Sequence, residues 1–171
     1  MEDNTTIIFK GQSNAAPFEE IIVEWHDIIS NNIPKINWTQ VHAIANYNGK
    51  VVAVSKITDG HTMIHVPGGH TEEGEDVETT LSREILEETG GTLISWKPIG
   101  YQKRTDSRGN ETHQLRVYAK VKDIKSKTID FDGRISEAKC IDISDMLDVL
   151  EWNNPIGRRI FELVNPEFIQ E

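Results

Sequence analysis

The stretch GHTEEGEDVETTLSREILEETGG, residues 69–91, decides the fold and carries the strongest functional signal of the 171-residue chain. Its second part predicts a helix over residues 77–89, because Asp76 is a good N-cap and Gly90 tolerates a left-handed stop. The glycines that precede this helix predict a loop that bends tightly and exposes its backbone. We therefore expect a loop and an acidic helix that act as one unit.

Three glutamates crowd one face of the predicted helix. Glu84, Glu87 and Glu88 stand at i, i+3 and i+4, so their carboxylates project together on a helix with about 3.6 residues per turn. Like charges at this spacing destabilise a helix, and the negative end of the helix dipole opposes them as well. Both penalties indicate a cation at this face. Carboxylate oxygens select Mg²⁺ or Mn²⁺ over zinc, and Mg²⁺ commonly shares its coordination with substrate phosphates.

The unit resembles the Nudix box, the signature of the Nudix hydrolase superfamily of MutT-like pyrophosphohydrolases. The family pattern is Gly, five residues, Glu, seven residues, Arg-Glu, an apolar residue, any residue, Glu-Glu, any residue, Gly and an apolar residue. The matching residues are Gly69, Glu75, Arg83, Glu84, Ile85, Glu87, Glu88 and Gly90. Only the last position departs from the pattern, since it holds Gly91, and we expect this to affect local packing rather than chemistry.

The resemblance implies metal-dependent hydrolysis of a diphosphate linkage by attack of water on phosphorus. The implied substrate is a nucleoside di- or triphosphate, or a nucleoside diphosphate joined to another moiety. The resemblance also implies an ion pair between Glu75 and Arg83 that fixes the helix against the loop. The implied ligands of Mg²⁺ or Mn²⁺ are Glu84, Glu87, Glu88 and the backbone carbonyl of Gly69.

The general base stays open between a box glutamate and a later carboxylate. Glu84 and Glu87 are the candidates inside the box. Glu137 resembles a late glutamate of the family and is the catalytic candidate outside the box, although an exposed glutamate before a strand is an equally good interpretation. Asp130 and Asp132 are weaker versions of the same idea.

Other interpretations of the box compete with a hydrolase. A merely solvated acidic face would not require glycines and Arg83 at set distances. A catalytically inactive nucleotide sensor with the same fold is the main alternative, although none of the box acids is replaced. An isopentenyl diphosphate isomerase is disfavoured, because that family resembles a version with a reactive cysteine before the box and Cys140 is the only cysteine here.

Composition predicts one compact domain and argues against DNA or long RNA as a partner. With 37% hydrophobic residues, the chain can bury a sizeable core. The lone Cys140 excludes an internal disulfide and is expected to be a small buried residue. A net charge of −10 argues against DNA or long RNA as a partner but allows small phosphorylated nucleotides. The amino terminus lacks the features of a signal peptide or membrane span, so we expect a cytoplasmic location.

Substrate contacts outside the box are only weakly indicated, so the exact substrate stays open. Six basic residues after the box could steer phosphates or ribose: Lys97, Lys103, Arg104, Arg108, Arg116 and Lys120. Four aromatic residues could stack on a base, although strand aromatics are more often core: Trp38, Trp96, Tyr101 and Tyr118. Four histidines lack the spacing of a zinc site, and the third of them could approach a phosphate: His42, His65, His70 and His113.

The remaining pattern predicts an α+β fold, with mixed strands and few helices, and the resemblance implies a Nudix-type α/β/α sandwich around a mixed β-sheet. A hairpin is expected at Gly49-Lys50. The expected strands are 39–48, 51–57, 63–66, 92–105, 112–122 and about 139–143. The expected carboxyl-terminal helices are 145–150 and 155–164, the second of which covers the sheet.

Residues 1–36 precede the part that resembles the family and are assigned as an N-terminal segment, with residues 37–171 as the Nudix hydrolase domain. Residues 5–10 predict a strand. Residues 17–30 predict an amphipathic helix, because apolar residues recur there at helical spacing. We expect this helix to pack on the core or against a second subunit, which leaves a homodimer open. A substrate lid is the less favoured alternative.

Overall fold

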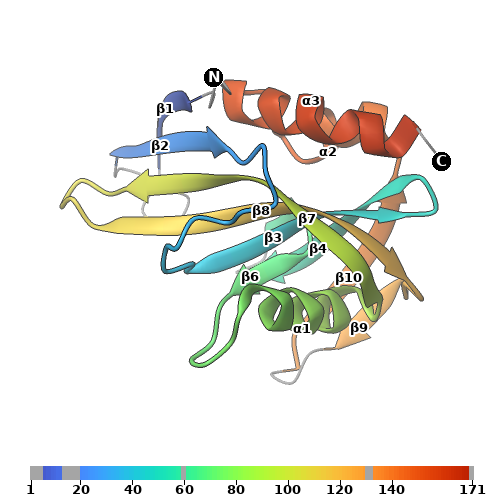
Figure 1. Cartoon of the computed structure of the whole chain (residues 1–171). Coiled ribbons are helices and arrows are strands. Elements are labelled where there is room, and N and C mark those ends of the chain that lie inside the picture. Colours follow the sequence, from blue (N-terminus) through green and yellow to red (C-terminus); the bar gives the residue numbers. More distant parts are fainter. Residues whose placement is uncertain (1–5, 13–19, 59–60, 130–132, 170–171) are drawn as a thin grey trace.

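The computed structural model describes residues 6–12, 20–58, 61–129 and 133–169. Figure 1 shows a β-sheet with helices on both faces. Helix α1 (Val77–Thr89) covers one face, and α2 (Met146–Val149) and α3 (Pro155–Ile169) cover the other. The predicted α+β class and the α/β/α sandwich around a mixed sheet are therefore confirmed. None of the helices in these described ranges is long and apolar enough to cross a bilayer.

The described strands form one sheet in the order β1-β2-β7-β8-β3-β4-β10-β9, with β5 paired to β4 and β6 paired to β3. Strands β3 and β8 are parallel, and the other paired strands are antiparallel. A turn of 3-10 helix, η1 (Ile143–Asp145), leads into α2. The strands are β1 (Thr6–Gln12), β2 (Glu20–Asp27), β3 (Gln40–Tyr47), β4 (Lys50–Thr58), β5 (His61–His65), β6 (Gly68–His70), β7 (Thr92–Thr105), β8 (Glu111–Lys122), β9 (Lys127–Ile129) and β10 (Ile135–Ile141).

Several elements agree closely with the sequence prediction. Helix α1 and strand β7 have the predicted bounds, and the predicted hairpin joins β3 to β4. Its turn lies one residue earlier than expected, at Asn48 and Gly49, whose φ angles are 52° and 76°. Two successive positive φ angles match the twist of paired strands, which explains why the chain turns there.

The predicted amphipathic helix over residues 17–30 is wrong, because residues 20–27 form strand β2. Side chains of β2 alternate between buried and accessible, a period of two that belongs to a strand. The apolar residues of this segment fit the helical spacing as well as the alternation of a strand. The pairing of β2 with β7 and β1 makes the segment a strand. The predicted strand at 5–10 is confirmed as β1, except for Thr5, which lies outside the described residues together with residues 13–19.

Smaller differences concern the ends of elements. Residues 68–70 form β6 instead of a loop, because they pair with β3. Helix α3 continues beyond the predicted end and past Pro166, since Phe168 is buried against the sheet and holds the last turn in place. Cys140 is exposed, which corrects the expectation of a buried residue. The last strand begins earlier than expected, as β10, through its pairing with β4 and β9.

The sheet separates two apolar cores. One core lies under α2 and α3, and the other lies under α1. Because side chains alternate along a strand, even-numbered residues of β3 and β8, such as Ile44 and Tyr118, face the first core. Odd-numbered residues, such as Val41 and Leu115, face α1. The position of each side chain in β3 and β8 therefore tells which layer it can contact.

Replacement of Trp25 tests whether strand β2 belongs to the folded core. Trp25 is fully buried and donates from Nε1 to Asp27 at 2.6 Å. Replacing Trp25 with Ala should lower the free energy of unfolding by about 3–5 kcal/mol, because the cavity left behind cannot collapse fully. Urea denaturation followed by circular dichroism measures this. The control Ile22→Ala, at a side chain 40% exposed in the same strand, should cost less than about 1 kcal/mol. Equal losses of unfolding free energy in the two variants would contradict the assignment of β2 to the cooperative core.

Candidate active site

Helix α1 is fixed at both ends and along one side. The carboxylate of Asp76 accepts the backbone N–H of Thr79 at 2.8 Å, and this bond lowers the pKa of Asp76. Gly90 closes the helix with a φ of 63°. Leu81 and Ile85 are fully buried against the sheet. These contacts hold the helix in one rotation about its axis, in which its glutamates face the edge formed by β6.

Arg83 joins this helix to the loop that precedes it. Its Nε and Nη2 donate to the two carboxylate oxygens of Glu75 at 2.8 and 2.9 Å, and Nη2 also donates to the carbonyl of His70 at 2.9 Å. Its Nη1 donates to Glu84 at 2.9 Å and to Glu87 at 3.4 Å. The bonds from Arg83 lower the pKa of Glu75 to about 2 and, in turn, raise the pKa of Arg83. One guanidinium thus orders the loop and two box glutamates.

Glu88 lies deeper than the other box acids, with a side chain only 3% exposed. It accepts the backbone N–H of Gly68 at 3.0 Å and forms an ion pair with Lys56 of β4. Burial, together with the charge of Glu88, raises the pKa of Glu84. Buried carboxylates are costly unless a cation or a donor lies beside them. Lys56 and Arg83 supply that positive charge.

Two adjacent glycines let the backbone approach these carboxylates. A Cβ atom on Gly69 would lie 2.3 Å from Oε1 of Glu84, so any side chain there would displace the carboxylate. A Cβ atom on Gly68 would lie 2.3 Å from the carbonyl oxygen of Val41, and the φ of Gly68 is 147°. Only glycine fits both positions without strain. The cradle between β6 and α1 therefore depends on these glycines.

The donors gathered at this cradle are oxygens, which fit Mg²⁺ or Mn²⁺ by their hardness. The three box glutamates supply them. In the described part of the chain, no three acidic, histidine or cysteine side chains are already arranged around one ion position. Instead, Lys56 pairs with Glu88, and Arg83 pairs with both Glu84 and Glu87. The chemistry of the donors thus fits a divalent ion, and the two cations mark where positive charge is needed.

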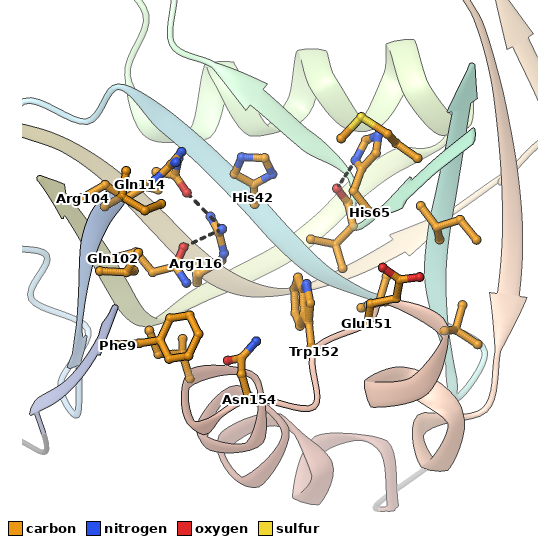
Figure 2. A pocket seen from close by; sticks show the side chains of 18 of the residues that line it. Phe9, His42, His65, Gln102, Arg104, Gln114, Arg116, Glu151, Trp152 and Asn154 are labelled. Atoms are coloured by element: carbon orange, nitrogen blue, oxygen red, sulfur yellow. Dashed lines mark hydrogen bonds between the residues drawn. The ribbon is translucent and has the colours of Figure 1, made fainter. Parts of the chain in front are cut away.

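A cavity of about 750 Å³ lies on the opposite face of the sheet, between the strands and the segment that joins α2 to α3. In Figure 2 the side chains of Arg116 and His42 point into this cavity from the sheet, and Trp152 enters it from that joining segment. Pockets of roughly 300–1,000 Å³ hold ligands of small-molecule size. The cavity is therefore large enough for a nucleotide.

One short strand separates the cavity from the box glutamates. Val66 lines the cavity, and Gly68, two residues later, donates its N–H to Glu88. On its other side Gly68 packs on His42, whose Nδ1 would lie 2.8 Å from a Cβ atom at that position. The cavity and the carboxylates thus lie back to back across β6.

Glu137, the catalytic candidate outside the box, lies exposed in β10 opposite Ser55 of β4. Its neighbour Ser136 pairs with Lys56, which contacts Glu88. Because side chains alternate along a strand, Glu137 is directed to the other face of the sheet, away from Glu88. The structure therefore does not bring Glu137 together with the box glutamates. The weaker candidates at 130 and 132 lie outside the described residues.

The structure shows which of the predicted substrate contacts line the cavity. Two of the six basic candidates, Arg104 and Arg116, line the cavity. The four aromatic candidates belong to the cores instead and do not line this described cavity. Sequence reasoning missed Phe9 and Trp152, which do line it. The one sequence signal for such a residue was the position of Trp152, in a short segment just before the helix that begins at Pro155. An aromatic residue in such a segment has less reason to pack into a core than one in a strand.

Comparison with known proteins gives a family and a fold. The sequence profile of the NUDIX domain matches residues 37–164. A NUDIX hydrolase from Nitrosomonas europaea is 23% identical with a TM-score of 0.59, over 75% of this chain and 88% of that chain. A pyrophosphohydrolase from Bacillus subtilis is 18% identical with a TM-score of 0.55, over 77% of each chain. An ADP compounds hydrolase is 13% identical with a TM-score of 0.59, over 97% of this chain and 95% of that chain.

No curated protein matches the sequence. At the identities given, the solved structures show a shared fold. The third of them covers nearly the whole chain, so its likeness includes the strands that precede residue 37.

The ion pair between Glu75 and Arg83 should make the free energy of unfolding depend on pH. The pKa of Glu75 is about 2, below its usual 4.5, so its charge stabilises the folded state fully above pH 4.5 and loses this effect as the pH falls toward 2. Glu75→Gln should therefore cost about 2 kcal/mol of unfolding free energy at pH 7. The difference from wild type should shrink steadily in denaturation curves recorded at lower pH. The exposed neighbour Glu73 provides the control: Glu73→Gln should match wild type throughout, and a pH-independent cost in Glu75→Gln would contradict the pairing.

Proposed function

Because the chain belongs to the NUDIX domain family, we propose that it hydrolyses a diphosphate linkage by attack of water on phosphorus. The proposed substrate is a nucleoside diphosphate joined to another moiety, or a nucleoside di- or triphosphate. Family membership confirms the predicted enzyme class, a Nudix-type pyrophosphohydrolase. The observation that carries the proposal is the set of three glutamates, Glu84, Glu87 and Glu88, held together at one edge of the sheet beside Arg83 and Lys56.

We assign Mg²⁺ or Mn²⁺ to these three glutamates and the carbonyl of Gly69. When bound, such an ion neutralises the diphosphate and lowers the pKa of the attacking water. The chain's own residues prepare the site: Arg83 orients Glu84 and Glu87, and the N–H of Gly68 holds Glu88. Lys56 supplies positive charge to Glu88 in this structure, and it would release Glu88 to a bound ion.

Exposure favours Glu87 as the general base. Its side chain is 35% exposed, against 11% for Glu84 and 3% for Glu88. A base has to reach a water molecule, whereas a metal ligand can be deeply buried. Glu84 is the second candidate inside the box. Glu137 is the candidate outside it, and its direction on β10 makes it the weaker of the proposals.

The organic part of the substrate is assigned to the cavity on the other face of β6. Its volume, about 750 Å³, suits a nucleotide. The ADP compounds hydrolase shares the fold over 97% of this chain, which supports a nucleoside diphosphate compound as the substrate. The net charge of −10 favours a small phosphorylated nucleotide over DNA. A homodimer and a cytoplasmic location stay predictions from the sequence.

Substitution of the box acids tests the function. Glu87→Gln and Glu88→Gln should each lower kcat by about a thousandfold or more, because each removes a carboxylate ligand of the ion that neutralises the diphosphate. The measurement is magnesium-dependent product release, with products identified by mass. The substrate panel contains nucleoside triphosphates and their oxidised forms, dinucleotide polyphosphates, ADP-ribose, nucleotide sugars and capped RNA.

Glu73→Gln, in the exposed part of the same loop, is the matched control and should keep full activity. Circular dichroism should show an unchanged fold in all three variants. Full turnover in either box variant would refute the assigned roles. Nucleotide binding by wild type without release of any product across the panel would support the sensor instead.

Lys56 provides a test of metal binding that does not depend on turnover. Without metal, Lys56→Met should lower the free energy of unfolding by about 1–3 kcal/mol, because Glu88 is left buried beside Glu84 without its cation. Excess magnesium should restore most of this loss, since the ion takes the place of the ammonium group. Chemical denaturation with and without magnesium measures both quantities. Lys50→Met, which removes an exposed pair with Asp142, should not respond to magnesium. A loss in Lys56→Met that magnesium leaves unchanged would contradict a metal site at Glu88.

A further inference from the structure

Arg116, in the middle of β8, is the buried charged residue of the cavity wall, with an exposed fraction of 8%. Its Nη2 donates to the side-chain oxygens of Gln102 at 3.0 Å and Gln114 at 3.1 Å. Figure 2 shows both bonds as dashed lines, with the guanidinium group on the side of the cavity that faces Trp152. Its Nε and Nη1 are buried and have no hydrogen-bond partner in the described structure. Three of the five N–H donors of this guanidinium group are therefore unused, in a residue that lines the cavity.

No carboxylate compensates this charge within the described ranges. Arg104 also lines the cavity and adds a second positive charge. Burial, with a smaller effect from Arg104, lowers the pKa of Arg116 to about 10, so it still carries its charge at neutral pH. Among the described residues that line the cavity, the one acid is Glu151, which is exposed and lies beyond Trp152 in Figure 2. The cavity thus has a cationic end in a chain whose net charge is −10.

Two other partly buried arginines are compensated by acids. Arg83, with a side chain 22% exposed, is paired with Glu75, and Arg159, at 28%, is paired with Asp27 at 2.7 Å. Arg116 is more buried than either and has only the two neutral glutamines. A purely structural role would explain the bonds to Nη2 but not the unpaired Nε and Nη1. A buried charge without a partner is expensive, which indicates that the missing partner comes from outside the chain.

The groups around Arg116 indicate the chemical class of its missing partner. Burial, with help from Arg116, keeps the pKa of His42 well below its usual value, so its imidazole is neutral and adds no charge at pH 7. Phe9 and Trp152 provide flat apolar walls. Two guanidinium groups together carry two positive charges, which match the charge of about −2 on a phosphate monoester. Guanidinium groups also bind phosphate oxygens through several parallel hydrogen bonds.

We propose that Arg116 and Arg104 form a receptor for a phosphate group carried on the part of the substrate that enters the cavity. This phosphate is separate from the diphosphate assigned to the box glutamates. The inference rests on the proposed function only in taking the ligand to be the substrate. It narrows the substrate class to a nucleoside diphosphate compound that bears a further phosphate away from the bond to be cleaved.

Binding of inorganic phosphate to the metal-free protein tests the receptor without any turnover. Phosphate should raise the melting temperature of wild type by several degrees at constant ionic strength, because it binds the folded state alone. Arg116→Met should lose most of this shift. Arg108→Met, at an arginine whose side chain is 78% exposed, is the matched control and should keep it. Arg104→Met, at a half-buried position, should reduce the shift and decides the question if Arg116→Met does not fold. An absent shift in wild type, or an unchanged shift in the receptor variants, would overturn the receptor.

Pairs of substrates that differ by one phosphate test whether the receptor determines substrate preference. NADPH and NADH differ by one ribose phosphate, as do coenzyme A and its dephosphorylated form. In wild type, kcat/KM should be at least about tenfold higher for the phosphorylated member of a pair, and this ratio should approach one in Arg104→Met. Equal values for both members of both pairs in wild type would overturn the narrowed substrate class.

The two experiments separate the receptor from the hydrolase. If phosphate stabilises wild type through Arg116 but no compound is cleaved, the receptor stands and the proposed function fails. If compounds are cleaved without regard to the extra phosphate and phosphate gives no shift, the hydrolase stands and the receptor fails.

Discussion

The guanidinium group of Arg83 holds the candidate site together. It fixes Glu75 and the His70 carbonyl on the loop side, and it fixes Glu84 and Glu87 on its own helix. Without it, four oxygen groups of the same sign or dipole direction would repel one another across a tight turn. The remaining box acid, Glu88, lies out of its reach and depends on a lysine from a different strand. The site thus needs the helix, the loop and the sheet in their folded positions at once.

The sheet divides the work of the molecule between its two faces. The face under α1 carries the carboxylates, and the face under α2 and α3 carries the cavity with its buried arginine. Gly68 is the point where the two faces meet, since it donates to Glu88 and packs on His42. A side chain at this position would push the two halves apart. The proposed substrate, with a diphosphate and a separate phosphate, suits such a division, because each group meets its own chemical environment.

Local signals explain which parts of this structure can be predicted from the sequence. The bounds of α1 follow from Asp76 and Gly90, which act within one turn of the helix, and the charge pattern of the box follows from helical spacing alone. The strand β2 could not be assigned in this way, because its apolar residues fit either period and pairing with β7 decides. The direction of Glu137 depends on its register against β4.

Arg116 shows the same limit within the cavity. It was one of six basic residues in the sequence with equal claims. Its burial is produced by neighbouring strands and by a segment more than 30 residues further along the chain. A contact between elements distant in sequence leaves no mark in the local pattern, so neither the cavity nor its unpaired guanidinium group could be foreseen.

The first two strands lie outside the segment that the NUDIX profile matches, yet Phe9, Ile21 and Val23 form part of the cavity wall. The acids that define the family and part of the wall of the cavity, where the organic part of the substrate is proposed to bind, therefore come from different stretches of the chain. Strands β1 and β2 can therefore vary without a change at the edge that holds the carboxylates. Exchanging these two strands for those of another protein would be a route to a cavity that admits a different molecule.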